Sequence, residues 1–380
     1  MSEVDLKTLG ENSRDEEHKI PTAMQEVNAA LKECGFGWFH IRLLLSAFVG
    51  YTCGVSMAMT TPYILPIAEC DLNMNLVDKG VLNAIPYVGM IASSAIAGFL
   101  TDTFGRKKFL VYGFGGLFIF TVISGLSQKY SILVISKFFE GFIFAASFTP
   151  LMSLTSELCH SEIRDRVMLV QSSFVAVGQI SVALVSWAIL TRDWKDTLFG
   201  GYFVLKTWNY YLLIMSLWSF CACFLYMFIP ESPKYYITQN KFDEARSILI
   251  QIYKTNTRKP AESFKYINLW MSKTKQGRNE YPDGEHKSQL SAGFENIKPL
   301  FQKPLILYLS LLCFINFFTM TQYNVLRLWF PQLSTIVENY RSNGTEDLCV
   351  MLDTYTRDLR EKAKIAINEV CVPVSTFFLY

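Results

Sequence analysis

Two charged side chains stand inside an otherwise apolar stretch and are the most chemically distinctive residues of this sequence. Lys137 and Glu140 are three positions apart, so on a helix they share one face and can form an ion pair. Charges inside apolar helices are costly and often serve binding or ion movement. Two interpretations stay open: the pair lines a polar path and couples solute movement, or it only packs neighbouring helices.

Uncharged polar side chains in other apolar stretches form a second group of candidates. Each could contact a polar solute, or could hydrogen-bond to a neighbouring helix and serve packing alone. The candidates are Asn83, Tyr87, Gln171, Gln179, Asn316, Tyr323 and Asn324. Arg327 lies near the end of its apolar stretch, and we expect its long side chain to extend to the polar boundary.

Catalytic and metal-binding patterns are not evident in the sequence. The four histidines are isolated, and the nine cysteines are scattered without the paired spacing of metal sites. No nucleophile, base and orienting residue form a recognisable set. The net charge of +2, without a long basic run, gives no reason to expect a nucleic-acid partner. We therefore expect no enzyme activity, no metal site and no cofactor.

The elements that position these residues are predicted to be membrane-spanning helices. Charged residues make up 18% of the chain, below the ~25% of typical soluble domains. They cluster between apolar stretches of about 20 residues, the length that crosses a bilayer. Backbone polar groups must be satisfied internally there, so we predict helices and no strands. The seven predicted spans are 41–67, 80–100, 109–126, 132–151, 167–190, 210–229 and 305–330.

Positive charges in the short connections indicate the orientation of the helices. Arg106, Lys107 and Lys108 follow the second span, and Arg164 and Arg166 follow the fourth. Because cytoplasmic loops are enriched in Lys and Arg, we predict a cytosolic N-terminus. The chain is expected to be an integral multi-pass protein in the lipid bilayer of the plasma membrane or of an intracellular vesicle.

The apolar spans and the predicted orientation divide the chain into cytosolic, membrane-spanning and non-cytosolic segments. Within the polar region after the sixth span, Phe242, Ala245, Ile248 and Leu249 have helical spacing, which predicts an amphipathic helix. The final apolar run is too short to cross a bilayer. The segments are a cytosolic N-terminal segment (1–40), a six-span unit (41–229), a cytosolic loop with the amphipathic helix (230–303), span seven (304–330), a lumenal or extracellular loop (331–369) and the start of a truncated span eight (370–380).

The loop at 331–369 has features of a non-cytosolic segment. Asn343-Gly344-Thr345 is a sequon for N-linked glycosylation, and the predicted orientation places it on the side where glycosylation occurs. Cys349 and Cys371 would share this oxidising compartment, but their spacing leaves open whether they form a disulfide.

The strongest motif lies where the second span meets the third. The pattern G-x-x-x-D-x-x-G-R-K is formed by Gly98, Asp102, Gly105, Arg106 and Lys107. Gly98 permits close helix approach, and Gly105 can adopt the positive φ of a tight reversal. Asp102 is expected to accept charge-assisted hydrogen bonds from Arg106 or from a helix N-terminus.

Two more motifs follow the fourth and sixth spans. Glu157 and Arg164 form an E-x6-R pattern, and Asp165 comes next. After the sixth span the chain reads Pro230-Glu231-Ser232-Pro233-Lys234. Proline cannot continue the sixth span, whereas Ser232 is suited to cap a new helix whose first residue is Pro233.

These three motifs, in this order, resemble the major facilitator superfamily of transporters, and the third is typical of its sugar porters. Softer matches resemble the synaptic vesicle glycoprotein 2 branch, and they are Cys34–Gly37, Leu65–Leu72, Asp78–Ala84 and Leu328–Leu333. The resemblance covers roughly residues 30–335. It implies an all-α membrane protein with the major facilitator fold: a complete N-terminal six-helix half, span seven and the start of span eight, truncated at the C-terminus.

The sequence departs from that branch at two places. Members of the branch often carry acidic residues in the first span, whereas residues 41–68 contain neither Asp nor Glu, and Gly54 and Met57 stand at the corresponding positions. Lys137 stands where Arg is common. The missing acids weaken the case for ion coupling through the first span.

The resemblance implies that the protein carries a small organic solute, with or without a coupling ion, by alternating access of two six-helix halves. In complete relatives the signature loop works against a helix of the second half, so Asp102 would lack that partner here. The alternative is a non-transporting membrane glycoprotein of vesicles or the cell surface that acts as a receptor or scaffold. The absence of acids in the first span and the glycosylated loop favour this alternative.

Overall fold

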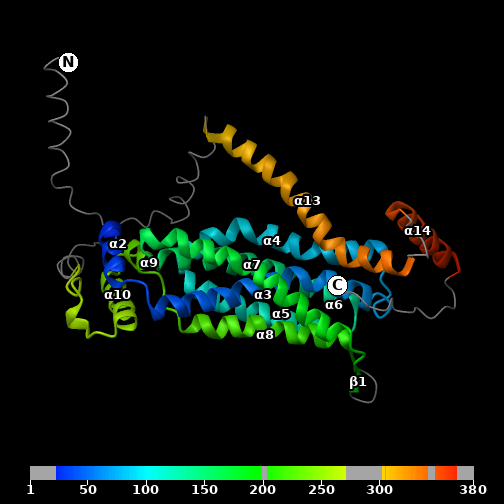
Figure 1. Ribbon diagram of the computed structural model, residues 1–380, viewed down its shortest axis with the longest axis horizontal. Coiled ribbons are helices and arrows are strands. Elements are labelled where there is room, and N and C mark those ends of the chain that lie inside the picture. The colour runs from blue at the N-terminus through cyan, green and yellow to red at the C-terminus, as the bar shows by residue number, and fades with distance from the viewer. Residues whose placement is uncertain (1–22, 199–202, 271–301, 304, 341–346, 366–380) are drawn as a thin grey trace, which may run out of the picture.

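A bundle of long helices makes up most of the protein (Figure 1). The computed structural model describes residues 23–198, 203–270, 302–303, 305–340 and 347–365, except for the side chains at 95–100, 102–104, 335, 338–340, 348 and 359–365. The bundle helices are α3 (Trp38–Ala68), α4 (Leu76–Phe104), α5 (Arg106–Gly125), α6 (Tyr130–Glu157), α7 (Ser161–Leu190) and α8 (Thr207–Met227).

Each predicted span corresponds to one helix, and the seventh is α13 (Leu305–Tyr340). Within the described residues, six helices are long and apolar enough to cross a membrane: α3, α5, α6, α7, α8 and the Leu305–Ser334 part of α13. The predicted helical membrane fold is therefore confirmed. The predicted start of span eight at 370–380 lies outside the described residues.

Close packing of α4 against α6 depends on glycine. A Cβ atom on Gly141 would lie 1.9 Å from the carbonyl oxygen of Pro86, and one on Gly89 would lie 2.2 Å from that of Phe138. Both distances are too short for any side chain, so the two helix backbones touch directly at these positions. Without a hydrophobic force between helices in lipid, such small-residue contacts are a main source of helix association.

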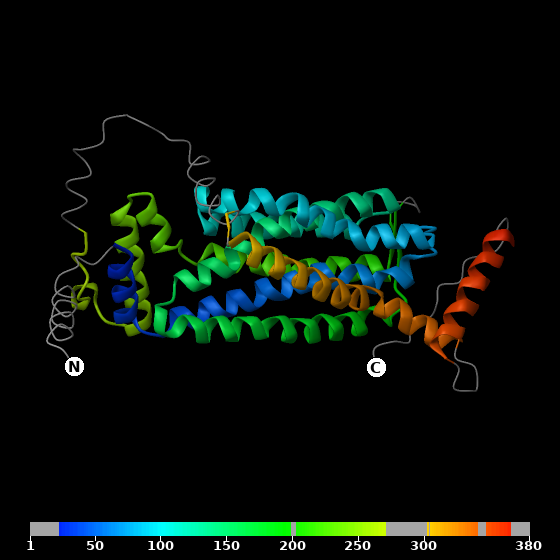
Figure 2. The same cartoon turned by 90° about the horizontal axis from the view of Figure 1, so that it is seen from above.

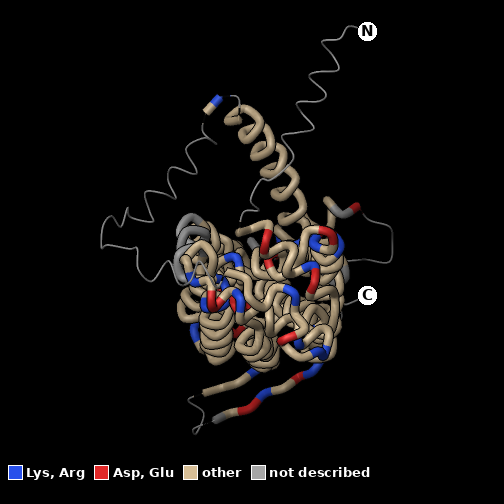
Figure 3. The backbone as a smooth tube through the Cα atoms, turned by 90° about the vertical axis from the view of Figure 1, so that its left-hand side faces the viewer, with Lys and Arg blue, Asp and Glu red and all other residues tan. Residues whose placement is uncertain are grey.

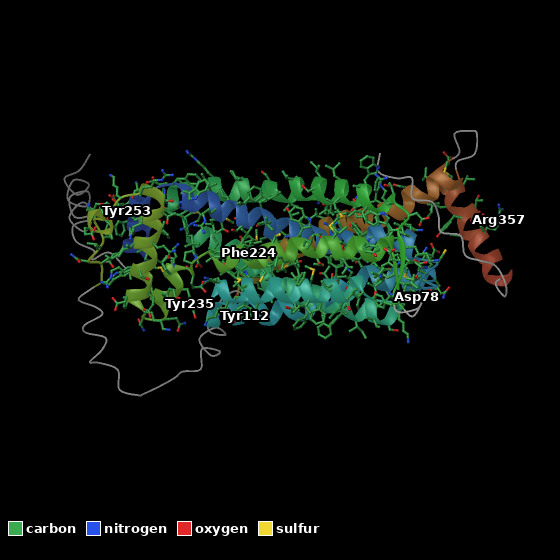
Figure 4. All side chains as sticks on the ribbon, turned by 90° about the horizontal axis from the view of Figure 1, so that it is seen from below. Asp78, Tyr112, Phe224, Tyr235, Tyr253 and Arg357 are labelled. Atoms are coloured by element: carbon green, nitrogen blue, oxygen red, sulfur yellow. The ribbon has the colours of Figure 1, made fainter. Side chains whose placement is uncertain are left out.

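The two ends of the bundle differ (Figure 2). The end that carries the three sequence motifs, which we call the motif end, has a layer of helices. These are α2 (Ala23–Cys34), α9 (Pro233–Thr238) and α10 (Phe242–Thr257). Figure 4 shows Tyr235 and Tyr253 at this end and Asp78 at the other. On α10, the residues whose spacing predicted the helix are buried, including Ile252 and Tyr253, except that Phe242 is partly buried.

The helix α2 is an element that our sequence analysis did not predict. It buries Val27, Ala30 and Leu31 in the core of the motif end. Asn28 exchanges two hydrogen bonds with Ser161 at the start of α7, at 2.8 and 3.0 Å. From α10, the amide of Asn256 donates to the carbonyl of Gly35 at 2.9 Å. These contacts tie the segment before the first span to both neighbouring helices.

The opposite end carries a short hairpin, which the sequence analysis did not predict. Strands β1 (Lys195–Leu198) and β2 (Phe203–Lys206) pair in an antiparallel ladder. The hairpin lies beyond the apolar spans, so the rule that favours helices inside a bilayer does not act on it. At its base the carboxylate of Asp71 pairs with Lys206 and accepts from the indole of Trp208 at 2.9 Å. We call this the hairpin end.

Helix α13 crosses the bundle obliquely and carries few charges along its length (Figures 1 and 3). It continues through Pro331 to Tyr340, whereas the predicted span ended at 330. A proline removes one helical hydrogen bond but does not have to end a membrane helix. A separate helix, α14 (Leu348–Ile365), occupies part of the predicted loop at 331–369.

The cysteine pairing left open by the sequence is not the one found. Cys349 is a free thiol, and Cys70 is disulfide-bonded. Disulfides depend on the distance and direction of the two Cβ atoms, which spacing along the chain does not reveal.

Candidate functional site

At the motif end, Glu231 caps the helix that follows the signature loop. Its two carboxylate oxygens accept hydrogen bonds from the backbone N–H groups of Arg106, at 3.1 Å, and Lys107, at 2.9 Å. These are the first residues of α5, where unsatisfied N–H groups and the helix dipole favour a negative charge. These hydrogen bonds connect the start of α5 to Glu231, which follows α8 in the chain.

Gly105 makes this contact possible. Its φ is +98°, the positive conformation predicted for it, and an added Cβ atom would lie 2.6 Å from a carboxylate oxygen of Glu231. Any larger residue would be strained in conformation and would push the capping carboxylate away.

Arg106 connects all three motifs. Its guanidinium pairs with Glu157 at 3.0 Å and lies 5.8 Å from the centre of the Tyr235 ring. Arg164 donates from Nε to the carbonyl oxygen of Ser156 at 3.0 Å, and so holds the end of α6. We call Arg106, Lys107, Glu157, Glu231 and Tyr235 the motif cluster.

The pKa values of Glu231 and of the neighbouring Lys234 reflect their burial. Burial raises the pKa of the Glu231 carboxyl, although the N–H groups around it act in the opposite direction. Burial and the nearby Arg164 lower the pKa of Lys234. Both groups therefore hold their charge less readily than in water, because the partly apolar surroundings disfavour ions.

The remaining residues of these motifs agree in part with their predicted roles. The hydroxyl of Ser232 accepts from the N–H of Tyr235 at 3.4 Å, and Pro233 begins α9, which confirms the predicted cap; Pro230 lies between α8 and α9. Gly98 and Asp102 lie in the last part of α4, but their side-chain surroundings are outside the described residues, so the predicted bonds of Asp102 stay a prediction.

Sequence analysis expected Asp102 to accept from Arg106 or from a helix N-terminus, and it did not predict that Glu231 caps α5. The signal that could have suggested it is a carboxylate between two prolines, directly after a span and next to a helix start. No spacing rule relates it to α5, because the two are more than a hundred residues apart, as the hydrogen bonds show.

The buried pair lies deep between three helices. Lys137 and Glu140 on α6 are 2.8 Å apart, with 0% and 1% of their side chains exposed. The ammonium also donates to Thr60 of α3 at 3.2 Å, and Ser124 of α5 donates to the carboxylate at 2.6 Å. Every partner comes from the protein, so the pair is neutralised where it stands.

A third group forms where α13 crosses α4. Arg327 donates to the hydroxyl of Tyr87 at 2.9 Å, and its guanidinium lies 5.4 Å from the centre of the Tyr323 ring. The Tyr323 hydroxyl accepts from the amide of Gln179 on α7 at 3.3 Å. Asn83 donates to the carbonyl of Leu328 at 3.3 Å. We call Asn83, Tyr87, Gln179, Tyr323 and Arg327 the span-seven cluster.

Four of the seven uncharged candidates thus meet at one place, and three do not. Gln171 is fully buried in α7, where its side chain interacts with Tyr51 of α3. Asn324 turns back to the carbonyl of Met320 on its own helix, at 2.8 Å. Asn316 is exposed on α13, and Asn343 lies outside the described residues.

The motif cluster, the buried pair and the span-seven cluster together offer groups that could bind a polar or charged molecule. Within the described ranges, no three His, Cys, Asp or Glu residues gather in a way that could hold a metal ion. The arrangement offers hydrogen-bond donors, fixed charges and aromatic rings, which suit reversible binding of a polar molecule.

Solved structures of partial likeness include two transporters. The xylose transporter XylE from E. coli, partially occluded and inward open, is 17% identical, with a TM-score of 0.49, over 63% of this chain and 61% of that chain. A bacterial homolog of the human lysosomal transporter Spinster is 13% identical, with a TM-score of 0.47, over 52% and 44%.

Comparison with sequences identifies the family. Synaptic vesicle glycoprotein 2A of Homo sapiens is 26% identical over 234 residues, 62% of this chain and 32% of that protein. Synaptic vesicle glycoprotein 2B of Rattus norvegicus is 25% identical over 273 residues, 72% and 39%. The chain thus matches less than half the length of these relatives. Residues 40–326 match the profile of the family described as Sugar (and other) transporter, and the chain therefore belongs to that transporter family.

Proposed function

We propose that this protein moves a small polar organic solute across a membrane by alternating access. The observation that carries the proposal is the motif cluster, in which Arg106 and Glu231 join three separate connections at one end of an apolar bundle. A transporter of this type opens and closes its two ends in turn. Contacts made of charges and helix caps can be broken and re-formed without exposing apolar surface.

The proposal includes an orientation. The basic connections that hold Arg106, Lys107 and Arg164 lie at the motif end, which we place in the cytosol. The hairpin end then faces the lumen or the outside, together with Asn343 as a glycosylation site. The match to the family described as Sugar (and other) transporter supports a sugar-sized solute, and a coupling ion is part of the same proposal.

A second function is favoured by the buried pair. Lys137 is neutralised by Glu140 on its own helix and has no exposed surface, as expected of a pair that packs helices. The alternative proposal is therefore a non-transporting membrane glycoprotein that acts as a receptor or scaffold.

Transport can be tested by reconstituting the full chain into liposomes and following the uptake of labelled D-glucose, D-xylose, D-glucuronate and choline. We expect uptake of at least one solute above that of protein-free liposomes. Glu231→Gln should slow it, because one of the two capping hydrogen bonds at α5 is weakened. Glu244→Gln, on the exposed face of α10, is the matched control and should transport like the wild type.

Two results would decide against transport. One is uptake no faster than in protein-free liposomes for every solute, from protein that is folded by its melting transition. The other is uptake that Glu231→Gln and Glu244→Gln reduce equally, since the motif cluster would then have no specific part in it.

A further inference from the structure

The span-seven cluster contains a cation whose charge no described side chain balances. Arg327 has none of the described carboxylates within ion-pair distance, in contrast to Lys79, which pairs with Glu69. The two acids that precede α4 are already engaged, because Glu69 pairs with Lys79 and Asp71 pairs with Lys206. An intramembrane cation without a counterion is costly and is a site candidate by default.

The side chain of Arg327 contacts the bundle, whereas the sequence analysis expected it to extend to the polar boundary. It is only partly exposed, and it is held against the bundle by the hydroxyl of Tyr87 and the ring of Tyr323. Figure 1 shows that α13 reaches the bundle at this crossing with its later half. Two tyrosines thus fix the guanidinium in place without neutralising it.

Most of the hydrogen-bonding capacity of this guanidinium is unused. It donates to Tyr87, and its Nε is buried without an acceptor among the described residues. A guanidinium carries five N–H donors in a planar fork, which matches the two oxygens of a carboxylate. The fork is therefore arranged for an anion that the described residues do not supply.

Asn83 adds an acceptor beside this donor group. Its amide nitrogen donates to the carbonyl of Leu328, the residue after Arg327, while its Oδ1 is buried without a donor. The side chain is 4% exposed, so an unsatisfied oxygen there is unfavourable. A hydroxyl group on a bound molecule would satisfy it.

We propose that the span-seven cluster binds a hydroxylated organic acid, with its carboxylate on Arg327 and a hydroxyl on Oδ1 of Asn83. The inference rests on the transport function proposed above and names its substrate class, a hydroxycarboxylate such as a sugar acid. Tyr87 and Tyr323 position the guanidinium, and Gln179 positions the Tyr323 hydroxyl.

The test compares two probes that differ in one group, D-glucuronate and D-glucose, by isothermal titration of the purified full chain in lipid nanodiscs. Wild type should bind D-glucuronate about tenfold or more tightly than D-glucose, the gain of a charge-assisted pair. Arg327→Gln should abolish that preference by weakening D-glucuronate binding about tenfold or more. Arg327→Lys should keep part of it, because lysine keeps the charge but not the fork.

Arg192→Gln is the control, since it removes an exposed arginine at the hairpin end and should leave both affinities unchanged. Equal affinity for the two probes, binding of neither, or a preference that survives Arg327→Gln would overturn the proposal. A melting transition shows whether each variant is folded.

Liposome uptake separates this inference from the transport proposal. Uptake of a neutral solute that is the same in wild type and Arg327→Gln, without acid binding, leaves transport standing and rejects the acid site. Acid binding that depends on Arg327 without uptake of any solute rejects transport and keeps a ligand site.

Discussion

Lys137 and Arg327 are both cations in apolar helices, yet their surroundings are opposite. Lys137 is enclosed by Glu140, Thr60 and three packed helices, and none of its side chain is exposed. Arg327 is partly exposed and contacts two tyrosines but no described carboxylate. Sequence analysis favoured a boundary position for Arg327 and left both interpretations of Lys137 open.

The difference shows that the partners of a charge, more than its depth, indicate its role. An ion pair whose charges are balanced by protein groups has no capacity left to bind a ligand, and it stabilises one arrangement of helices. A cation fixed by neutral groups keeps its capacity for an anion that arrives from outside. Four predictions test whether this contrast is real.

The largest effect is expected when the buried pair is broken. Glu140→Gln leaves the ammonium of Lys137 buried without a counterion, which should destabilise the protein by about 3–5 kcal/mol. Denaturant unfolding in detergent, followed by tryptophan fluorescence, measures it. The double variant Lys137→Met, Glu140→Leu should recover most of the loss, because no charge is then buried.

The surface ion pair of Lys32 and Glu162 provides the control. Each side chain is 60% exposed, so Glu162→Gln should change stability by less than about 1 kcal/mol. If Glu140→Gln reduced stability as little as this control, Lys137 would not depend on Glu140 for its neutralisation.

A second effect concerns the close contact between α4 and α6, next to the buried pair in sequence. Gly141 is next to Glu140, and a methyl group on it would meet the carbonyl of Pro86. Gly141→Ala should force α4 and α6 apart and cost about 1–3 kcal/mol. Gly80→Ala is the matched control, since nothing lies within 4 Å of a Cβ atom there. Equal melting temperatures for the two variants would contradict the close contact.

A third prediction extends the contrast to a carboxylate, Glu231, whose pKa is raised by burial. A raised pKa means that the folded protein favours the protonated acid. The stability contributed by Glu231 is therefore full below its ordinary pKa of 4.5 and is lost as pH rises through the higher folded value. Relative to Glu231→Gln, the wild type should become less stable over that rise. Parallel stability curves would show that the carboxylate is not buried.

The smallest effect on stability is expected at Arg327. Replacement by methionine removes no ion pair, so Arg327→Met should change the free energy of unfolding by only about 0.5 kcal/mol. A loss as large as that of Glu140→Gln would mean that Arg327 has a counterion, and the contrast between the two cations would fail. Thermal unfolding of both variants in the same detergent makes the comparison direct.

Much of the fold and part of the site were predictable from the sequence. Every predicted span corresponds to a helix, since apolar length alone specifies helices in lipid. The positive φ of Gly105 and the cap at Ser232 follow from local chemistry and were predicted. The hairpin and α2 were missed, because both are short elements outside the apolar spans, where the bilayer imposes no rule.

The sequence by itself determined where the long apolar helices lie along the chain, the three motifs and the family, because these depend on composition and local spacing. Only the tertiary structure decided that Glu231 caps α5, that Lys137 is neutralised within its own helix and supported by two others, and that Asn83, Tyr87 and Arg327 meet. Contacts between distant segments depend on how helices cross, and helix crossing is set by the packing of whole surfaces, which no single stretch of sequence contains.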